Sequence, residues 1–411
     1  MDTTAYAPPT ADIDARRRLA LIVGVVGLAA CGLGFAIDRG NFYRAWLIGY
    51  LMWLSVSLGS MALMMVHHLS GGAWGLVVRR VFEASAKTLP LMAVLFVPIV
   101  LGLESLYPWT HPDLVAADEI LQHKAIYLNT PFFLARAVIY FAGWILLASL
   151  LSRWSRAQDE GDEATTARMR KLSGAGLVFY AFSVTAASID WVMSLTPHWF
   201  STLFGFIFVG TQGLSALAFT ILIMVFLGRR APMDTVFKAN HFHDMGKLTL
   251  AFVMLWAYFQ FSQYMLIFAA NVLEEIPYYL SRIDHGWQYV GIFLVVFQFF
   301  VPFALLLSRD VKRASNRLML IAVWLLVVRF VDNVFLVSPE FDPSGMSLHM
   351  EAGAEAGEHT SAFFVHWLDV AAPMAIGGLW VWLFFSNLRA RPLLPVRDPY
   401  LQNALESSGG H

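Results

Sequence analysis

Ten long apolar runs follow one another along the chain, from near its first residue to near its last. A helix needs about 20 apolar residues to cross a bilayer, and it satisfies its own backbone hydrogen bonds there. We predict spans at approximately 19–37, 45–66, 88–106, 131–151, 172–193, 202–227, 247–270, 286–307, 318–337 and 362–387. The expected fold class is therefore an all-α polytopic membrane protein with about ten transmembrane helices.

Composition excludes several functional classes. With 58% hydrophobic and only 14% charged residues, the chain is too apolar for an ordinary soluble enzyme. A net charge of -1 leaves no basic excess, so we expect no nucleic-acid partner. The single cysteine, Cys31, cannot form an internal disulfide, hold an iron–sulfur cluster or attach a c-type haem. We expect no cofactor bound covalently or through metal ligation in this chain.

Basic residues concentrate in alternate connecting segments. Cytoplasmic segments carry the excess of Lys and Arg, so this pattern predicts cytoplasmic tails at 1–18 and 388–411. The basic side holds 22 of the 28 Lys and Arg residues, namely Arg16, Arg17, Arg18, Arg79, Arg80, Lys87, Arg153, Arg156, Arg168, Arg170, Lys171, Arg229, Arg230, Lys238, Lys247, Arg309, Lys312, Arg313, Arg317, Arg389, Arg391 and Arg397.

The other side is predicted to be external. It holds Arg39, Arg44, Lys124, Arg136 and Arg282, with acidic loops at Asp113–Glu119, Glu274–Glu275 and Glu340–Glu358. The first run follows Arg16–Arg18 as the apolar part of a signal peptide would. It is long for that role and nine runs follow it, so we interpret it as an uncleaved helix.

An internal repeat is indicated where the fifth and ninth runs end. The two strings are Asp190-Trp-Val-Met-Ser-Leu-Thr-Pro197 and Asp332-Asn-Val-Phe-Leu-Val-Ser-Pro339, which share their Asp, Val and Pro positions. We predict two four-helix units of the same orientation, at about 45–193 and 202–337, flanked by the first and tenth helices.

Ionisable residues inside the external half of the runs are the main site candidates. These are Asp190, Arg329, Asp332, His366, Asp369 and Glu104. Arg329 and Asp332 are spaced to share a helix face, as are His366 and Asp369. Because charge is costly in hydrocarbon, they indicate either a buried polar pocket and proton path, or satisfied pairs that fasten helices. We expect Asp190 and Glu104, which lie close to helix ends, at a solvated rim.

Weaker candidates lie on the cytoplasmic side: His67, His68, Glu83, Lys87, His241, His243 and Asp244. They are candidates for proton uptake. His241, His243 and Asp244 also allow a metal site, but no further ligand is set by spacing, and we favour a polar segment at the lipid headgroups.

The positions of the histidines do not favour a b-type haem, because no two face each other well inside a predicted bilayer. A quinone is a possible ligand of the seventh run. Trp256, Tyr258, Phe259, Phe261, Gln263 and Tyr264 combine aromatic surface with groups that hydrogen-bond a carbonyl. The alternative that we favour is that they face lipid or form an interfacial belt.

Three strings carry a family resemblance. They are Asp190-Trp-Val-Met-Ser-Leu-Thr-Pro-His-Trp-Phe-Ser-Thr, His243-Asp-Met-Gly-Lys-Leu-Thr-Leu-Ala-Phe and Trp256-Ala-Tyr-Phe-Gln-Phe-Ser-Gln-Tyr-Met-Leu-Ile. With the number and orientation of the spans, from about Gly40 to Leu388, they resemble the ActF-type membrane subunits of bacterial alternative complex III, relatives of NrfD and PsrC.

The resemblance implies two four-helix bundles with a flanking helix pair and no metal centre of their own. It implies a multi-pass subunit of the bacterial cytoplasmic membrane that serves quinol oxidation. Its partners would be an NrfD-like sister subunit, an iron–sulfur subunit, haem c subunits, the quinone pool and the lipid bilayer. The redox step, which passes electrons to cytochrome c or an oxidase, would lie in those partners, while this chain contributes scaffold, possible quinone contact and a proton path.

Two alternatives remain from the residues alone. Buried Asp, His and Arg in a duplicated bundle are also typical of an autonomous secondary transporter, although no broken helix recurs in both halves. A purely structural anchor would differ in tolerating isosteric neutral substitutions of the buried carboxylates.

Overall fold

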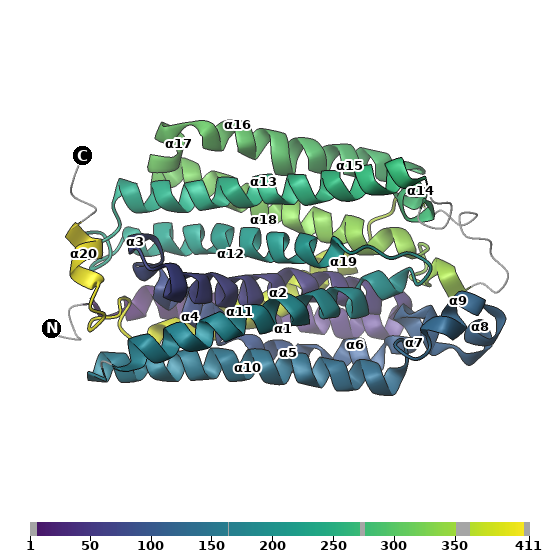
Figure 1. The fold of residues 1–411 in the computed structure, drawn as a ribbon, viewed down its shortest axis with the longest axis horizontal. Helices are drawn as coiled ribbons and strands as arrows, with labels where there is room; N and C mark the ends of the chain where they lie inside the picture. Colours follow the sequence, from purple (N-terminus) through teal and green to yellow (C-terminus); the bar gives the residue numbers. More distant parts are fainter. Residues whose placement is uncertain (1–5, 163, 272–275, 351–361, 407–411) are drawn as a thin grey trace.

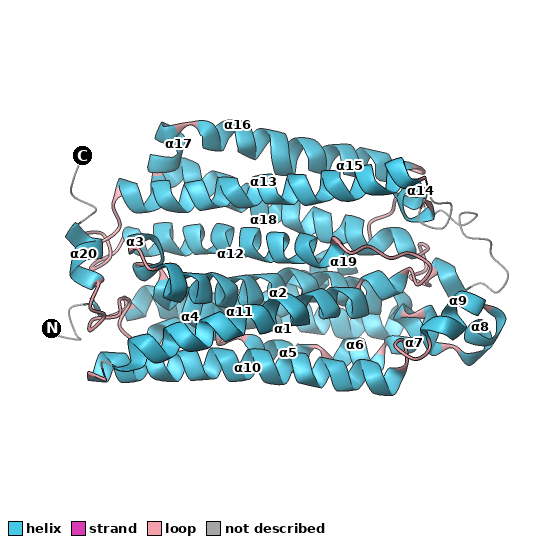
Figure 2. Ribbon diagram, viewed as in Figure 1, coloured by secondary structure: helices cyan, strands magenta, loops and turns pink. Residues whose placement is uncertain are grey.

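A bundle of long helices, aligned side by side, makes up the protein in a computed structural model that describes residues 6–162, 164–271, 276–350 and 362–406 (Figures 1 and 2). The described residues include no strand, only an isolated bridge between Phe341 and Ser347. Within these residues, ten helices are long and apolar enough to cross a membrane, as predicted. The chain is an all-α polytopic membrane protein.

The ten spans are α1 (Thr10–Ile37), α2 (Arg39–Ser70), the third span Arg79–Leu101, α10 (Thr130–Glu160), α11 (Ala164–Trp191) with η3 (Met193–Leu195), α12 (Phe204–Gly228), α13 (Ala239–Ala270), the eighth span Trp287–Leu307, α18 (Ser315–Val337) with η5 (Ser338–Glu340), and α19 (Leu368–Arg389). Several helices continue beyond their apolar runs, because a helix that leaves the bilayer keeps its internal hydrogen bonds. The tenth span starts later than the predicted 362, at Leu368.

The third and eighth spans are interrupted. The third consists of α4 (Arg79–Ala86), α5 (Leu89–Leu95) and α6 (Val97–Leu101), followed by α7 (Leu103–Leu106). Pro90 and Pro98 stand in the first turns of α5 and α6, where a residue without an N–H group is tolerated. The eighth consists of α15 (Trp287–Leu294), a π-helical segment η4 (Val295–Phe300) and α16 (Val301–Leu307).

The start of α1 and the last described helix, α20 (Leu401–Glu406), lie at one end of the bundle; we call this the terminal end (Figure 1). The opposite end, here the loop end, carries α8 (Pro112–Ala117), α9 (Glu119–Lys124) and α14 (Pro277–Ile283). The other short elements are α3 (Ala73–Leu76), η2 (Pro108–Thr110), α17 (Arg309–Arg313) and η6 (Leu348–Met350). Glu274, Glu275 and the acidic stretch 351–358 lie outside the described residues.

The centre of the bundle is formed by α2 and α12, which pack on each other and are the most buried spans. α2 also packs on α11 and α18, and α12 packs on the same two helices. Each central helix thus contacts the last helix of its own predicted unit and the last helix of the other. The duplication itself remains a prediction. Two duplicated units would produce this arrangement, in which each central helix contacts both α11 and α18.

The first and last spans pack closely against each other. A Cβ atom on Gly27 would lie 2.6 Å from the backbone nitrogen of Ala375, and one on Gly24 would lie 2.8 Å from that of Leu379. On α19, a Cβ atom on Gly378 would meet the backbone of Gly24. The flanking helices therefore form a pair in which glycines allow the two backbones to approach.

Candidate functional site

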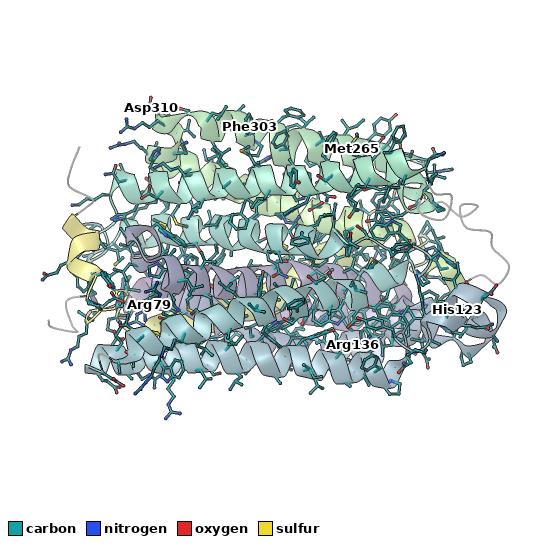
Figure 3. The ribbon with its side chains drawn as sticks, in the orientation of Figure 1. Arg79, His123, Arg136, Met265, Phe303 and Asp310 are labelled. Carbon is teal, nitrogen blue, oxygen red and sulfur yellow. The ribbon has the colours of Figure 1, made fainter. Side chains whose placement is uncertain are left out.

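Buried ionisable side chains gather at both ends of the bundle. Figure 3 labels one member of each group, Arg79 at the terminal end and Arg136 towards the loop end. Among the described residues of the loop end there are four buried Arg–carboxylate pairs: Arg44 with Asp369, Arg136 with Asp190, Arg282 with Glu340, and Arg329 with Asp332. The first three join different elements, while Arg329 and Asp332 belong to one helix.

The pair of Arg136 and Asp190 connects α10 to α11. Arg136 donates from Nε and Nη2 to the two carboxylate oxygens at 2.8 and 2.9 Å, and the Tyr140 hydroxyl donates to Oδ2 at 2.8 Å. Arg136 Nη1 donates to the carbonyl of Tyr127 at 2.9 Å, and the guanidinium lies 3.8 Å from that ring's centroid. Asp190 is fully buried, so its expected solvated rim position is wrong. The local sequence places it near a helix end, but the neighbouring helix covers it.

The carboxylate of Asp369 pairs with Arg44 of α2 and not with the imidazole of His366. Arg44 Nη2 lies 2.9 and 3.1 Å from the two oxygens, and Arg44 Nη1 donates to Ser338 at 2.6 Å. His366 contributes its backbone N–H to Asp369, while its ring lies 3.8 Å from Asp38. The predicted pairing of the two side chains is wrong, because Asp369 stands in the first turn of α19 and His366 precedes the helix.

A third pair fixes the loop-end segment after α18. Arg282 Nη1 lies 2.7 Å from Glu340, which also lies 2.8 Å from His349. The guanidinium stacks 3.6 Å from the centroid of Tyr278, and that ring stacks 3.7 Å from Trp199. Glu340 is thus a buried partner and not a residue of a solvated acidic loop. Burial raises the pKa of the Tyr278 phenol, which lies outside the spans.

Asp332 lies deeper in its helix than Asp190 does and has weaker support. α11 ends one residue after Asp190, whereas α18 continues for five residues after Asp332. Asp332 pairs with Arg329 of its own helix, and Gln298 of η4 approaches it at 3.3 Å. Arg329 Nε, Gln298 Oε1 and Asn333 Nδ2 are buried and have no hydrogen-bond partner in the described part of the chain. We call Asp332, Arg329, Gln298 and Asn333 the Asp332 cluster. It has unused hydrogen-bond donors and one unused acceptor around a single carboxylate.

Of two other loop-end expectations, the solvated rim position expected for Glu104 agrees with the structure, and the placement of three arginines does not. Glu104 is exposed on α7, outside the buried clusters, and only its backbone carbonyl accepts a hydrogen bond, from His111. Arg44, Arg136 and Arg282, which the sequence assigned to the external side, are all buried and paired with carboxylates. Their partners were not identifiable from local spacing.

At the terminal end, Glu83 is the centre of a buried network. Its carboxylate accepts from Arg79 at 3.0 Å, Arg80 at 2.7 Å and Ser155 at 2.5 Å. Arg391 adds a contact at 3.3 Å. Two further carboxylates balance the arginines: Asp398 lies 2.9 Å from Arg79, and Asp159 pairs with Arg80. Outside the spans, burial lowers the pKa of Arg391, and Glu83 opposes that shift.

The other cytoplasmic-side candidates do not converge on one site. His67 is buried at the end of α2, and the His68 ring lies 3.0 Å from the Ser173 hydroxyl. Lys87 is partly buried after α4 and, with Arg80, Glu83 and Arg391, lines a small hollow. His241, His243 and Asp244 lie within the first turns of α13, not before it. The described residues contain no group of three or more His, Cys, Asp and Glu placed to hold one metal ion.

The aromatic residues of the seventh span separate by face. Tyr258, Phe261 and Tyr264 are exposed on the outside of the bundle, whereas Trp256 is buried. Gln263 is buried, with its amide between Ser201 and Tyr279 at 3.1 and 3.2 Å. The exposure of Tyr258, Phe261 and Tyr264 is that of a lipid-facing surface.

No protein-family model matches the chain, and no curated protein matches it either.

Proposed function

We propose that the chain is an integral membrane subunit of a respiratory quinol:electron-acceptor oxidoreductase of the alternative complex III type. It would lie in the bacterial cytoplasmic membrane with its terminal end in the cytoplasm. Iron–sulfur and haem c centres would belong to partner subunits on the loop-end side. The support is the resemblance of the three strings, the ten spans and the strongly basic terminal end.

The observation that carries a functional role within this subunit is the contrast between Asp190 and Asp332. All three nitrogens of the Arg136 guanidinium donate hydrogen bonds, and Asp190 accepts from two side chains, so this pair is held rigid. Asp332 has one arginine on its own helix and a long contact to Gln298. A carboxylate with free polar neighbours can bind and lose a proton without breaking a helix contact.

We assign proton exchange to the Asp332 cluster, and helix fastening to the Arg44–Asp369 and Arg136–Asp190 pairs, whose guanidinium nitrogens all have acceptors. Unused groups of Arg329, Asn333 and Gln298 offer two donors and one acceptor to water near the carboxylate. The adjacent π-helical segment supports this assignment, because such segments interrupt the regular hydrogen-bond ladder and occur frequently at functional sites.

The first experiment is a tagged purification from native membranes in mild detergent, with visible spectra and subunit identification. Haem c absorbance, an iron–sulfur protein and a second polytopic subunit in the same fraction would support the complex. A colourless chain that purifies alone would contradict it.

Asp332→Asn tests the residue assignment. We expect near-normal quinol oxidation by the purified complex in liposomes but reduced proton movement per electron, because the amide keeps the shape and cannot exchange a proton. Asp113→Asn removes an exposed carboxylate at the same end and is the matched control. Unchanged proton movement in Asp332→Asn would count against proton exchange at the Asp332 cluster.

The rival function, an autonomous transporter, has less support. The third span is interrupted, but the seventh, its counterpart in the predicted repeat, is the continuous helix α13. Transporters built from repeats place paired discontinuous helices around one central site. Substrate uptake by the isolated chain in liposomes would favour the transporter.

A further inference from the structure

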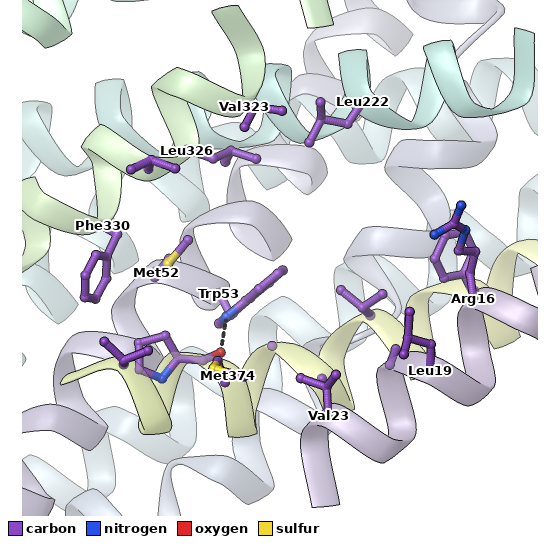
Figure 4. A pocket seen from close by; sticks show the side chains of 18 of the residues that line it. Arg16, Leu19, Val23, Met52, Trp53, Leu222, Val323, Leu326, Phe330 and Met374 are labelled. Carbon is purple, nitrogen blue, oxygen red and sulfur yellow. Dashed lines mark hydrogen bonds between the residues drawn. The ribbon is translucent and has the colours of Figure 1, made fainter. Parts of the chain in front are cut away.

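A long crevice runs along the outside of the bundle between the α1–α19 pair and α18. Its volume is about 590 Å³ and its lining is almost entirely apolar. Figure 4 shows Val323 and Phe330 of α18 on one side, and Val23 of α1 with Met374 of α19 on the other. Trp53 of α2 lies between these walls and donates its indole N–H to the carbonyl of Pro373 at 2.9 Å.

The crevice has an apolar interior even though an acid lines it. Asp369 contributes to the lining, but its charge is held by both contacts to Arg44. The indole N–H of Trp53 is likewise already bonded. A hydrocarbon chain is therefore the kind of ligand that matches the lining of the crevice.

At the terminal end, the crevice adjoins a second, polar hollow of about 480 Å³. Arg16 and Leu222 line both. Arg229 and Arg230 line the polar hollow together with one carboxylate, Asp12. The two hollows thus offer a continuous surface, apolar along the helices and basic at the membrane boundary.

Two of the three arginines of the polar hollow lie against one aromatic ring. The guanidinium of Arg230 lies 4.1 Å from the centroid of Phe226, and that of Arg16 lies 5.9 Å from it. Arg230 also pairs with Asp12 at 2.7 Å, and Arg229 donates to Asn316 at 2.8 Å. In the described part of the chain neither Arg16 nor Arg229 pairs with a carboxylate. Three arginines against one carboxylate leave a net positive site.

We propose that this combined site binds an anionic phospholipid, with its phosphate among Arg16, Arg229 and Arg230 and an acyl chain in the crevice. Charge complementarity selects the occupant: a zwitterionic lipid offers the same chain but no net charge for the excess arginines. The bound lipid fills the space between the flanking helix pair and α18, and so connects these two parts of the bundle. This lipid site is independent of the proposed respiratory role and of the Asp332 cluster.

The test uses the full chain, with its partner subunits if they copurify, and phosphatidylglycerol as the probe. We expect about one phosphatidylglycerol per chain in extracts of the purified protein, and a rise in the unfolding temperature when phosphatidylglycerol, but not phosphatidylcholine, is added back to delipidated protein. The double variant Arg229→Gln/Arg230→Gln should bind phosphatidylglycerol about 30-fold more weakly, since each basic residue near an anionic lipid contributes about a fivefold factor. Arg170→Gln/Lys171→Gln removes the same charge from exposed positions of α11 at the same end and should bind normally.

A second pair of variants keeps the test valid if the arginine variant is unstable. Val327→Trp narrows the crevice without changing charge, and it should also release the lipid. Val178→Trp places the same side chain on an exposed part of α11 and should not. Equal stabilisation by phosphatidylcholine, recovery of a quinone instead of a phospholipid, or cross-linking of Val327→Cys to a partner's helix in the intact complex would each overturn the proposal.

Discussion

The guanidinium of Arg136 has acceptors at all three nitrogens and an aromatic ring against it, whereas the buried Nε of Arg329 has no hydrogen-bond partner among the described residues. Both arginines lie within membrane-spanning helices beside a carboxylate. The difference is the number of donors and acceptors that the neighbouring helices provide. A fully bonded pair stabilises one arrangement of helices, while an incompletely bonded pair leaves room for water and a proton.

Removing one partner of the complete pair should be costly. Asp190→Asn leaves Arg136 charged and buried, so we expect it to lower the free energy of unfolding by about 3–5 kcal/mol. The double variant Arg136→Gln/Asp190→Asn should recover part of that loss, because no uncompensated charge remains. Thermal unfolding in detergent measures both, and a double variant less stable than Asp190→Asn would contradict the explanation.

Two buried phenols at the loop end predict how stability depends on pH. Burial, with Asp190 nearby, raises the pKa of Tyr107, and burial raises that of Tyr278, above the ordinary 10.0. The folded state then holds protons that the unfolded state loses, so stability is complete below about pH 10 and falls as the pH rises above it.

Tyr107→Phe removes both the ionisable phenol and the hydrogen bond that Tyr107 donates to the Trp191 carbonyl at 2.9 Å. The pH at which stability is measured separates the two contributions. We expect a lower unfolding temperature at neutral pH, because that bond is lost, and a smaller further decrease above about pH 10. Tyr400→Phe, at an exposed position, is the control. The same alkaline decrease in Tyr107→Phe as in the unchanged protein would show that Tyr107 is not responsible.

Sequence reasoning identified the buried carboxylates better than their partners. Asp190, Asp332 and Asp369 stand out because a charge inside an apolar run is visible locally. Arg44 lies 325 positions from Asp369, and no periodicity or spacing relates them. The available signal was that Arg44 and Arg136 fall within or beside apolar stretches, where an unpaired cation is unstable.

At the scale of helices, the ten spans follow from local hydropathy, and for that reason the sequence predicts them. The ends of the helices differ from the predicted ends, because helical hydrogen bonding continues into polar flanks such as the last turns of α10. The interruption of the third span could have been anticipated from Pro90 and Pro98. The π-helical segment before Pro302 could not, since it depends on how α15 and η4 pack on α18 and how α16 packs on α13.

The glycine contacts between α1 and α19 give a prediction with a control on the same helix. Gly27→Ala places a Cβ atom 2.7 Å from the Cα atom of Ala375, so one backbone must move. We expect a loss of about 1–3 kcal/mol in unfolding free energy. At Gly32 an added Cβ atom meets nothing within 4 Å, and Gly32→Ala should be neutral or slightly stabilising. Equal effects of the two substitutions on thermal unfolding would contradict close packing at Gly27.

At the scale of the whole molecule, the charges of the terminal end are balanced across distant parts of the chain. Arg79, Arg80 and Arg391 face Glu83, Asp159 and Asp398, which come from α4, α10 and the C-terminal segment. The C-terminal segment is bound further by Arg397, which donates to the Glu160 carbonyl at 2.8 Å. This network holds the end of the chain against the bundle.

Neutralising one member of that network should loosen the C-terminal segment. Asp398→Asn leaves one buried arginine in excess, and we expect faster proteolysis after α19 together with a decrease of about 1–3 kcal/mol in unfolding free energy. Asp310→Asn, at an exposed position of the same end, should change neither. Unaltered proteolysis of Asp398→Asn would show that the other contacts are enough to hold the C-terminal segment against the bundle.

The pairing of α1 with α19 also sets the order in which the protein can assemble. Until α19 has been synthesised, α1 faces lipid with its glycine surface, because only then is its main partner present. The eight helices between them can pack on one another during synthesis, but closure of the bundle waits for α19. A ribosome stalled before residue 368 would therefore hold a nearly complete bundle whose first helix is still free to be bound by an insertion factor or removed by a membrane protease.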